Sequence, residues 1–338
     1  MNTFDIPVAL FIFKRQKAVD VISRIREVRP KKIYLLADEG RNPQEKEAVQ
    51  ECRKKVEEAI DWDCEVIKNY AQENRGVYEN IGEGAKWVLR REKWAIFLED
   101  DNLPEVSFFE FCREMLHRYE EDTRILWVCG TNYLGQYQSP HGESYMFTRH
   151  MLPCGWASWA NKFEKFYDGH MELVKNPAVV ERIGNTYCNR SVYRQYRKQW
   201  MLEAERMAAG CRPSSWDYQM DFSIKANNLF GICPCNNQIR NIGVDEHSIH
   251  GGSSANAIMT KRFCGMGSYP LSFPLKHPAT VLPDKEFERK IGKIILIPFR
   301  VRAASGIRGC LVKTIKFLFQ IPKDQRTGDF FKKVLKKQ

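Results

Sequence analysis

The chain has 338 residues, of which 43% are hydrophobic and 12% aromatic, so it can bury a core and is unlike a disordered, charge-dominated chain. Its formal net charge is +11, and this excess lies in residues 285–338, which hold 15 Lys and Arg against 4 Asp and Glu. The remainder, 1–284, holds 38 Lys and Arg against 38 Asp and Glu, so the basic character belongs to the C-terminal segment alone.

Short β-rich runs alternate with helix-length segments from residue 1 to residue 130. The predicted strands are 7–13, 32–38, 64–70, 94–100 and 125–130, and the predicted helices are 16–28, 43–60, 76–92 and 105–121. Strands that are apolar throughout are typical of a parallel sheet covered on both faces. The pattern therefore predicts an α/β fold with a doubly wound, mostly parallel sheet.

From residue 131 to residue 250 the pattern is less regular. It predicts a strand at 144–150, mainly helical structure over 156–210, a further helix with Ser214 or Ser215 as its N-cap, and paired short strands over 230–243. Trp156 and Trp159 are expected to pack in the core rather than to stack on a ligand. Residues 251–284 are rich in Gly, Ser and Pro, which predicts a linker.

The eleven cysteines have no disulfide-like or zinc-like spacing, and the close pair Cys233 and Cys235 is a CxC rather than a CxxC. This usage predicts reduced, mostly buried thiols in a cytoplasmic protein. The N-terminus has no basic leader with a cleavable apolar core, and no run of about 18 apolar residues occurs. Neither a signal peptide nor a membrane-spanning helix is therefore expected.

Residues 285–338 form a basic tail that contains two amphipathic stretches. Their apolar residues are Ile307, Leu311, Val312, Ile315, Leu318 and Phe319 in the first stretch, and Phe330, Phe331, Val334 and Leu335 in the second. Lysines lie opposite these residues, which predicts a helix on an anionic membrane surface. The alternative is a helix that packs on its own domain with a solvated basic face. The tail has no nucleic-acid reading motif, so nucleic acid is not an expected partner.

The apolar run WAIFLEDDN, residues 94–102, ends in Glu99, Asp100 and Asp101, which we call the acidic triplet. Side chains alternate along a strand, so Glu99 and Asp101 are expected to share one side while Asp100 points away. Proteins commonly hold Mg²⁺ and Mn²⁺ with one or two carboxylates, and phosphate oxygens and water complete the coordination. The triplet thus predicts a divalent cation that faces a diphosphate, and the alternative is an acidic loop in water.

Arg15 and Asp38 also fall just past the ends of predicted strands. In doubly wound sheets, ligands bind at the carboxyl ends of the strands. We therefore expect Arg15, Asp38 and the acidic triplet to surround one crevice.

Several segments resemble one family of enzymes. PVALFIFKRQ, LLADEGR, NRGVYENIGEGAKWVL, FLEDDNLPEVSFFEF and PCGWASWANKF are similar to GT-A-fold, nucleotide-sugar-dependent glycosyltransferases. The likeness is greatest to the bacterial nucleotide-diphospho-sugar transferase group and more distant to N-acetylglucosaminyltransferase I. It implies a GT-A-like catalytic domain at 1–250, with a nucleotide-sugar-binding half at 1–130 and a helical acceptor half at 131–250. The catalytic domain is followed by the linker at 251–284 and the basic tail at 285–338.

The resemblance also implies roles for the acidic triplet. Asp101 would bind the Mn²⁺ or Mg²⁺ ion that bridges to the diphosphate, Asp100 would face the ribose, and Glu99 would face the transferred sugar. Arg15 and Asp38 would hold the nucleotide base and phosphates. The second motif is ADEGR, so Glu39 is an alternative to Asp38.

The resemblance implies a catalytic base and a further metal contact in the second half of the domain. Asp217, in SSWDYQMD, matches the acid that takes the proton of the acceptor hydroxyl, and Asp221 is the second choice one turn further on. His250, in NIGVDEHSIH, matches a histidine that approaches the metal or the diphosphate, with His247 as the alternative.

Together these features predict an inverting, metal-dependent glycosyltransferase at the inner face of the cell membrane. It would move a sugar from a nucleoside diphosphate, UDP in the first instance, to a hydroxyl of a lipid-linked or growing cell-surface glycan. A nucleotidyltransferase would need a Gly-rich phosphate loop after the first strand, and KRQKAVD contains no glycine. A non-enzymatic alternative is a membrane-docking adaptor with a degenerate sugar-nucleotide-binding domain.

Overall fold

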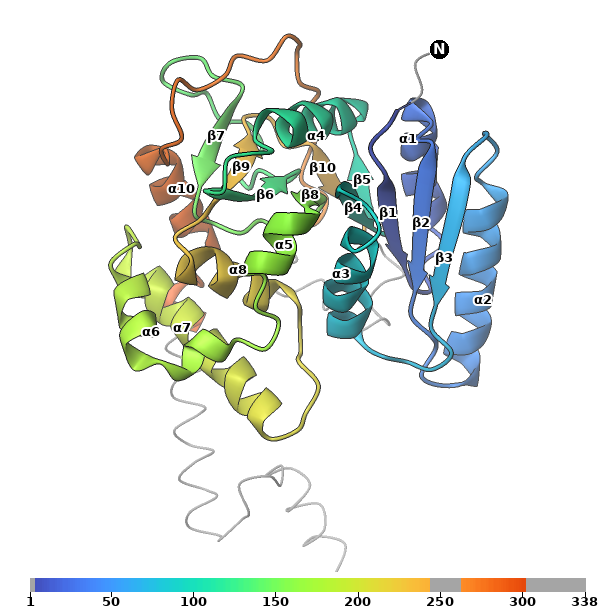
Figure 1. Cartoon of the computed structure of the whole chain (residues 1–338), viewed down its shortest axis with the longest axis horizontal. Coiled ribbons are helices and arrows are strands. Elements are labelled where there is room, and N and C mark those ends of the chain that lie inside the picture. The colour runs from blue at the N-terminus through green and yellow to red at the C-terminus, as the bar shows by residue number, and fades with distance from the viewer. Residues whose placement is uncertain (1–3, 244–262, 302–338) are drawn as a thin grey trace, which may run out of the picture. The chain divides into compact units, whose positions relative to one another are not determined.

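The computed structural model describes residues 4–243 and 263–301 of the chain (Figure 1). The chain divides into two compact units, Met1–Ile294 and Ile295–Gln338. The sheet, the helices and the candidate site below all belong to the first unit, and helix α10 ends at the boundary. The predictions for His247, His250 and residues 302–338 lie outside the described residues.

The first unit is built on an eight-stranded sheet in the order β3-β2-β1-β4-β8-β6-β9-β7. The strands are β1 Val8–Ile12, β2 Lys32–Ala37, β3 Glu65–Tyr70, β4 Trp94–Glu99, β6 Ile125–Cys129, β7 Tyr145–Thr148, β8 Trp156–Trp159 and β9 Phe230–Pro234. Strands β7 and β8 run antiparallel to their neighbours and the other pairs are parallel. This confirms the predicted α/β fold with a mostly parallel sheet. Two short strands, β5 Asn102–Pro104 and β10 Ile239–Asn241, form a separate antiparallel pair.

Helices cover both faces of the sheet (Figure 1). They are α1 Ala18–Val28, α2 Pro43–Glu58, the π-helix η1 Tyr78–Glu83, α3 Gly84–Leu89, α4 Val106–Arg118, α5 Ala160–Phe166, the 3₁₀ helix η2 Glu172–Lys175, α6 Pro177–Gly184, α7 Arg190–Ala208, α8 Asp217–Ala226 and α10 Lys285–Ile295. Helix α1 packs against α2 and α4, whereas α3 packs against α5. The strands and helices predicted between residues 1 and 130 are all present. Apolar strands bury their side chains in a central sheet, and amphipathic helices bury their apolar faces by packing on that sheet.

Strand β8 is absent from the prediction, which has helix over this region. Trp156 and Trp159 are both 1% exposed, and their strand lies between β4 and β6. The Trp156 ring stacks on Phe97 at a centroid distance of 4.0 Å and on Trp127 at 4.3 Å. These contacts confirm that Trp156 and Trp159 pack in the core. A strand of four residues buried on both faces has no alternating pattern that would reveal it.

The short strands predicted over 230–243 exist as β9 and β10, but the prediction that they pair with each other is wrong. Strand β9 pairs with β6 and β7, whereas β10 pairs with β5. The Asn132 amide donates to the carbonyls of Pro234 and Cys235 at 2.9 Å each. The backbone just after β9 is therefore bonded to another loop and does not form a hairpin.

The described part of the segment predicted as a linker packs on the domain. Leu275 and Val281 are 5% and 7% exposed and belong to the main hydrophobic core. The predicted tail begins at residue 285, whereas residues 285–294 belong to the first unit, because Phe287 and Ile291 of α10 are fully buried. In the part of the chain that the structure describes, no helix is both long and apolar enough to cross a membrane.

Candidate active site

A cavity of about 740 Å³ opens at the carboxyl ends of β1, β2 and β4, and we call it the strand-end cavity. Its lining residues are Phe11, Ile12, Phe13, Lys14, Arg15, Gln16, Lys17, Asp38, Arg41, Asn74, Gly76, Val77, Asn80, Ile81, Glu99, Asp100 and Gly243. Arg15, Asp38, Glu99 and Asp100, all predicted site residues, therefore surround one crevice. The volume falls within the range of about 300–1,000 Å³ that is typical of small-molecule sites.

Arg15 joins the acidic triplet to the end of β1. Its Nη1 donates to Asp100 Oδ1 at 2.8 Å and to Asp101 Oδ2 at 2.9 Å. Asp100 Oδ2 also accepts from the backbone N–H of Phe13 at 3.1 Å. Strand β4 ends at Glu99, so Asp100 and Asp101 lie in a turn. The expected strand alternation therefore stops at Glu99, and Asp100 faces the cavity beside Glu99 instead of pointing away.

Asp101 is 8% exposed and does not itself line the cavity, but it bonds to Arg15 and lies next to Gly243, both of which do. Its Oδ1 accepts from the Asn102 amide at 2.7 Å, and its backbone carbonyl accepts from Ile242 N–H at 2.8 Å. A Cβ on Gly243 would collide with Asp101 Oδ2, so a larger residue here would displace the Asp101 carboxylate. His250 follows Gly243 by seven positions in the sequence and lies outside the described residues.

Glu99 differs from its two neighbours because its carboxylate forms no hydrogen bond with any described residue. Burial raises the pKa of Glu99 to about 8, and the carboxylates of Asp101 and Asp100 contribute to this rise against the opposing effect of Arg15. Burial also raises the pKa of Asp100 to about 6, although Arg15 acts in the opposite direction. The acidic triplet thus holds more carboxyl groups than the one guanidinium that bonds to it, while Lys14, Lys17 and Arg41 also line the cavity.

The donor set of the acidic triplet fits a hard cation that shares its coordination with a substrate. The three carboxyl groups beside Arg15 leave acceptor oxygens that its guanidinium does not occupy. No group of three or more Asp, Glu, His or Cys side chains among the described residues converges as a complete metal cage. A Mg²⁺ or Mn²⁺ ion would therefore be held by one or two carboxylates, with phosphate oxygens and water in the other positions.

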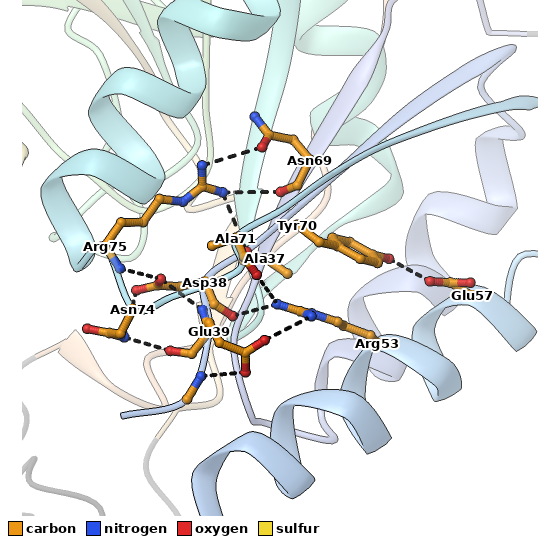
Figure 2. Close-up of polar contacts among 11 residues, drawn as sticks. Ala37, Asp38, Glu39, Arg53, Glu57, Asn69, Tyr70, Ala71, Asn74 and Arg75 are labelled. Carbon is orange, nitrogen blue, oxygen red and sulfur yellow. Dashed lines mark hydrogen bonds and ion pairs between the residues drawn. The ribbon is translucent and has the colours of Figure 1, made fainter. Parts of the chain in front are cut away.

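The Asp38 carboxylate is saturated by the loop that follows β3 (Figure 2). Asp38 Oδ1 accepts from the backbone N–H of Glu39 and of Arg75 at 2.8 Å each. Its Oδ2 accepts from the Asn74 amide at 3.0 Å and from Gly76 N–H at 2.9 Å. Asp38 therefore fixes the cavity wall formed by Asn74 and Gly76.

Arg53 of α2 ties the ends of β2 and β3 together beneath this wall (Figure 2). It donates to the carbonyls of Asp38 at 3.1 Å and Ala71 at 3.3 Å, and it pairs with Glu39 at 3.3 Å. Glu39 Oε1 accepts from Gly40 N–H at 2.8 Å, so both Glu39 oxygens also have partners. Glu39 does not line the cavity, which favours Asp38 of the two alternatives.

Asp217 stands at the first turn of α8, where the helix dipole favours an acid. Asp217 Oδ1 bonds to the hydroxyl of Ser215 and accepts from Tyr218 N–H. Burial raises the pKa of Asp217, and its charge acts on Glu99 across the site. Trp216, and not Ser214 or Ser215, is the N-cap residue, without a side-chain cap bond.

Asp221 lies one turn later but is 2% exposed and does not line the strand-end cavity. Its Oδ1 lies 3.8 Å from Lys225 Nζ, which is beyond hydrogen-bond distance. Burial raises the pKa of Asp221 to about 6 and lowers the pKa of Lys225. This environment is a buried charge pair. Asp217 does not line the cavity either, but its charge is one of those that raise the pKa of Glu99.

Sequence reasoning missed several cavity residues, among them Asn74, Arg41 and Asn80. Arg41 is held by Glu45, whose carboxylate accepts from Arg41 Nε at 2.8 Å. Asn80 lies in the π-helix η1. A polar residue in a loop or in the first turn of a helix carries no pattern that separates a ligand contact from a solvent contact, so the sequence held no signal for these positions.

No family model and no curated protein matches the chain, whereas solved structures do. One is a mannosyltransferase from Pyrobaculum calidifontis in complex with GDP-Man and Mn²⁺, with 12% identity, 67% of this chain and 70% of that chain covered, and a TM-score of 0.36. Another is mouse xyloside xylosyltransferase 1 in its apo form, with 11% identity, coverage of 66% and 82%, and a TM-score of 0.35.

A third structure is a UDP-glucose pyrophosphorylase complexed with UDP-glucose, with 8% identity, coverage of 71% and 94%, and a TM-score of 0.34. At these TM-scores the likeness carries no argument about what this chain binds. The strand order described above shows the α/β fold, and the strand-end cavity is its candidate active site.

Proposed function

We propose that the chain is a nucleotide-sugar-dependent glycosyltransferase. The observation that carries this proposal is the acidic triplet at the rim of the strand-end cavity, with one arginine across two of its acids and Glu99 without a hydrogen-bond partner among the described residues. A cavity that combines carboxylates for a cation, an arginine for phosphate and apolar walls suits a nucleoside diphosphate linked to a sugar.

In this proposal the donor lies along the carboxyl ends of the strands. Asp101 binds a Mn²⁺ or Mg²⁺ ion, Arg15 contacts the phosphates, and Asp100 faces the ribose. Asp38 shapes the wall at the nucleotide end through Asn74 and Gly76. Glu99 faces the transferred sugar, and His250 remains a proposed further contact of the metal or the diphosphate.

The reaction proposed is a single displacement with inversion at the anomeric carbon. Asp217 accepts the proton of the acceptor hydroxyl, the acceptor oxygen bonds to the anomeric carbon, and the bond from that carbon to the diphosphate oxygen breaks on the opposite face. The raised pKa of Asp217 suits a group that has to take a proton near neutral pH. A bound divalent cation would neutralise the charge that develops on the departing diphosphate.

The acceptor proposed is a hydroxyl of a lipid-linked or growing cell-surface glycan, reached from the cytoplasmic side of the membrane. The basis is the composition of the tail, since residues 302–338 hold 10 Lys and Arg against 2 Asp and Glu. Each Lys or Arg near an anionic surface contributes roughly 1 kcal/mol, so a few of them suffice for peripheral binding.

Calorimetry with UDP and Mn²⁺ tests the donor site, followed by a screen of nucleotide sugars for metal-dependent hydrolysis. Binding should be lost on chelation and in Asp101→Ala, and it should survive in Asp63→Ala, a variant at an exposed aspartate. If no nucleotide sugar and no nucleoside diphosphate binds, the transferase proposal fails and the adaptor remains.

A further inference from the structure

Asn80 has a buried side chain without a partner on the wall of the strand-end cavity. Asn80 is 6% exposed and lines the cavity, and its Oδ1 is buried without a hydrogen bond. Its Nδ2 has no hydrogen bond among the described residues, but unlike Oδ1 it is not a fully buried atom. A buried amide oxygen without a donor is destabilising, and native proteins rarely keep one without a reason.

The backbone around Asn80 is also unusual, because Tyr78–Glu83 form a π-helix. π-helical turns are rare and occur frequently at functional sites. The segment is pressed against its surroundings: a Cβ on Gly82 would lie 2.7 Å from Tyr167 Oη, and a Cβ on Gly84 would lie 2.8 Å from Leu36 Cδ2. The amide of Asn80 is therefore held on the cavity wall by a tightly packed support.

Asn80 and Glu99 line the cavity from the same face of the sheet. Phe11 pairs in register with Leu36 on one side and with Glu99 on the other, so the three side chains project to one face. Gly84 contacts Leu36 and Phe11 on that face, and Asn80 lies one turn before Gly84. Two unpartnered polar side chains, an amide and a carboxyl, thus share one wall of the cavity.

The chemistry of this pair fits hydroxyl groups better than phosphate. A hydroxyl both donates and accepts, so it can bond to the amide N–H, the amide carbonyl and the carboxyl group. A phosphate oxygen only accepts, so it cannot bond to the unpartnered Oδ1 of Asn80, and the charge of Asp100 nearby would repel it. We propose that Asn80, together with Glu99, is a specificity-determining residue that binds the hydroxyls of a sugar ring of the nucleotide sugar. This inference rests on the proposed function and deepens it.

The test compares wild type with Asn80→Leu, which has nearly the same shape but no polar atoms. Thermal unfolding is measured without ligand, and affinity is measured with Mn²⁺ for UDP, GDP, CDP, ADP and the glucose ester of each. We expect the Tm of Asn80→Leu to rise, because a buried amide oxygen without a donor is removed, while its affinity falls about tenfold or more. A fall for the diphosphates and their esters alike identifies the ribose, and a fall for the esters alone identifies the transferred sugar.

Asn132→Leu is the matched control, since Asn132 is fully buried but has partners for both its donor and its acceptor. This variant should lose stability and keep its affinity. Asn80→Leu with unchanged affinity for every ligand that wild type binds, or with a lowered Tm, overturns the inference alone. If wild type binds none of the ligands, the proposed function fails and the inference with it.

Discussion

One nitrogen of Arg15 bonds to two acids, Asp100 at 2.8 Å and Asp101 at 2.9 Å, as a cation between them would. In Arg15→Gln, Mn²⁺ alone should bind more tightly, because the guanidinium that competes with the ion for the Asp100 and Asp101 carboxylates is absent. UDP with Mn²⁺ should bind about tenfold or more weakly, since a charged hydrogen bond to phosphate contributes about 1.5–3 kcal/mol. Calorimetry measures both affinities.

The control for this prediction is Arg124→Gln, because Arg124 also pairs with a carboxylate, Asp122, at 2.7 Å, but outside the strand-end cavity. It should leave both affinities unchanged. Weaker binding of Mn²⁺ alone to Arg15→Gln would show that Arg15 supports the metal site and does not compete with it.

Asp38 should matter for folding as well as for binding. Asp38→Ala leaves three backbone N–H groups without an acceptor, those of Glu39, Arg75 and Gly76, and removes one of the two acceptors of the Asn74 amide. This should lower the free energy of unfolding by about 3 kcal/mol. Urea unfolding measures this loss. Asp61→Ala, which removes only an exposed ion pair with Arg26, should cost about 0–1 kcal/mol. Equal losses in the two variants would contradict the structural role of Asp38.

The fold was largely predictable because strands that are buried on both faces appear in the sequence as continuous apolar runs. Strand β1 is buried at every residue from Val8 to Ile12, and its apolar run has no other explanation in an α/β chain. Strand β8 and the partners of β9 were not predictable. Strand β8 is too short to show an alternation of apolar and polar residues. The partners of β9 depend on long-range contacts such as those of Asn132, which the sequence does not reveal.

The candidate site was predictable where charge ends an apolar strand. The acidic triplet and Arg15 meet because parallel strands bring their carboxyl ends to one edge. The saturation of Asp38 was not predictable, since most of its donors come from the loop that follows β3. The missing partner of Asn80 was equally hidden, because the sequence does not record which hydrogen bonds remain unmade.

Glu99 should make the stability of the protein fall as the pH rises. Burial raises the pKa of Glu99 to about 8, so between its ordinary value and about pH 8 the folded state holds a proton that the unfolded state releases. Unfolding is then favoured as the pH increases through this window. Glu99→Gln should have a flatter profile of Tm against pH and a higher Tm than wild type at pH 9. Glu73→Gln, at an exposed position, should follow wild type, and a parallel profile for Glu99→Gln would contradict the assignment.

Deletion of the residues that follow helix α10 should leave the domain stable, whereas a deletion that includes α10 should not. A protein that ends at residue 301 should keep its Tm and its donor affinity, and it should lose affinity for anionic vesicles in a sedimentation assay. A protein that ends at residue 284 should be strongly destabilised, because the loss of buried Phe287 and Ile291 costs about 5 kcal/mol or more. Vesicle binding that survives removal of residues 302–338 would contradict the membrane role of the tail.

Substitution of Asp217 should lower the rate of transfer, whereas substitution of Asp221 should lower the stability of the protein. Asp217→Asn keeps the shape of the side chain but removes the proposed base, so kcat for transfer should fall about 10²–10⁴-fold with donor affinity nearly unchanged. Asp221→Asn leaves Lys225 buried beside a neutral amide, so its main effect should be a lower Tm. Steady-state transfer and thermal unfolding of both variants decide between the two acids. Asp221→Asn with a normal Tm and no transfer would move the base to Asp221, one turn further into α8.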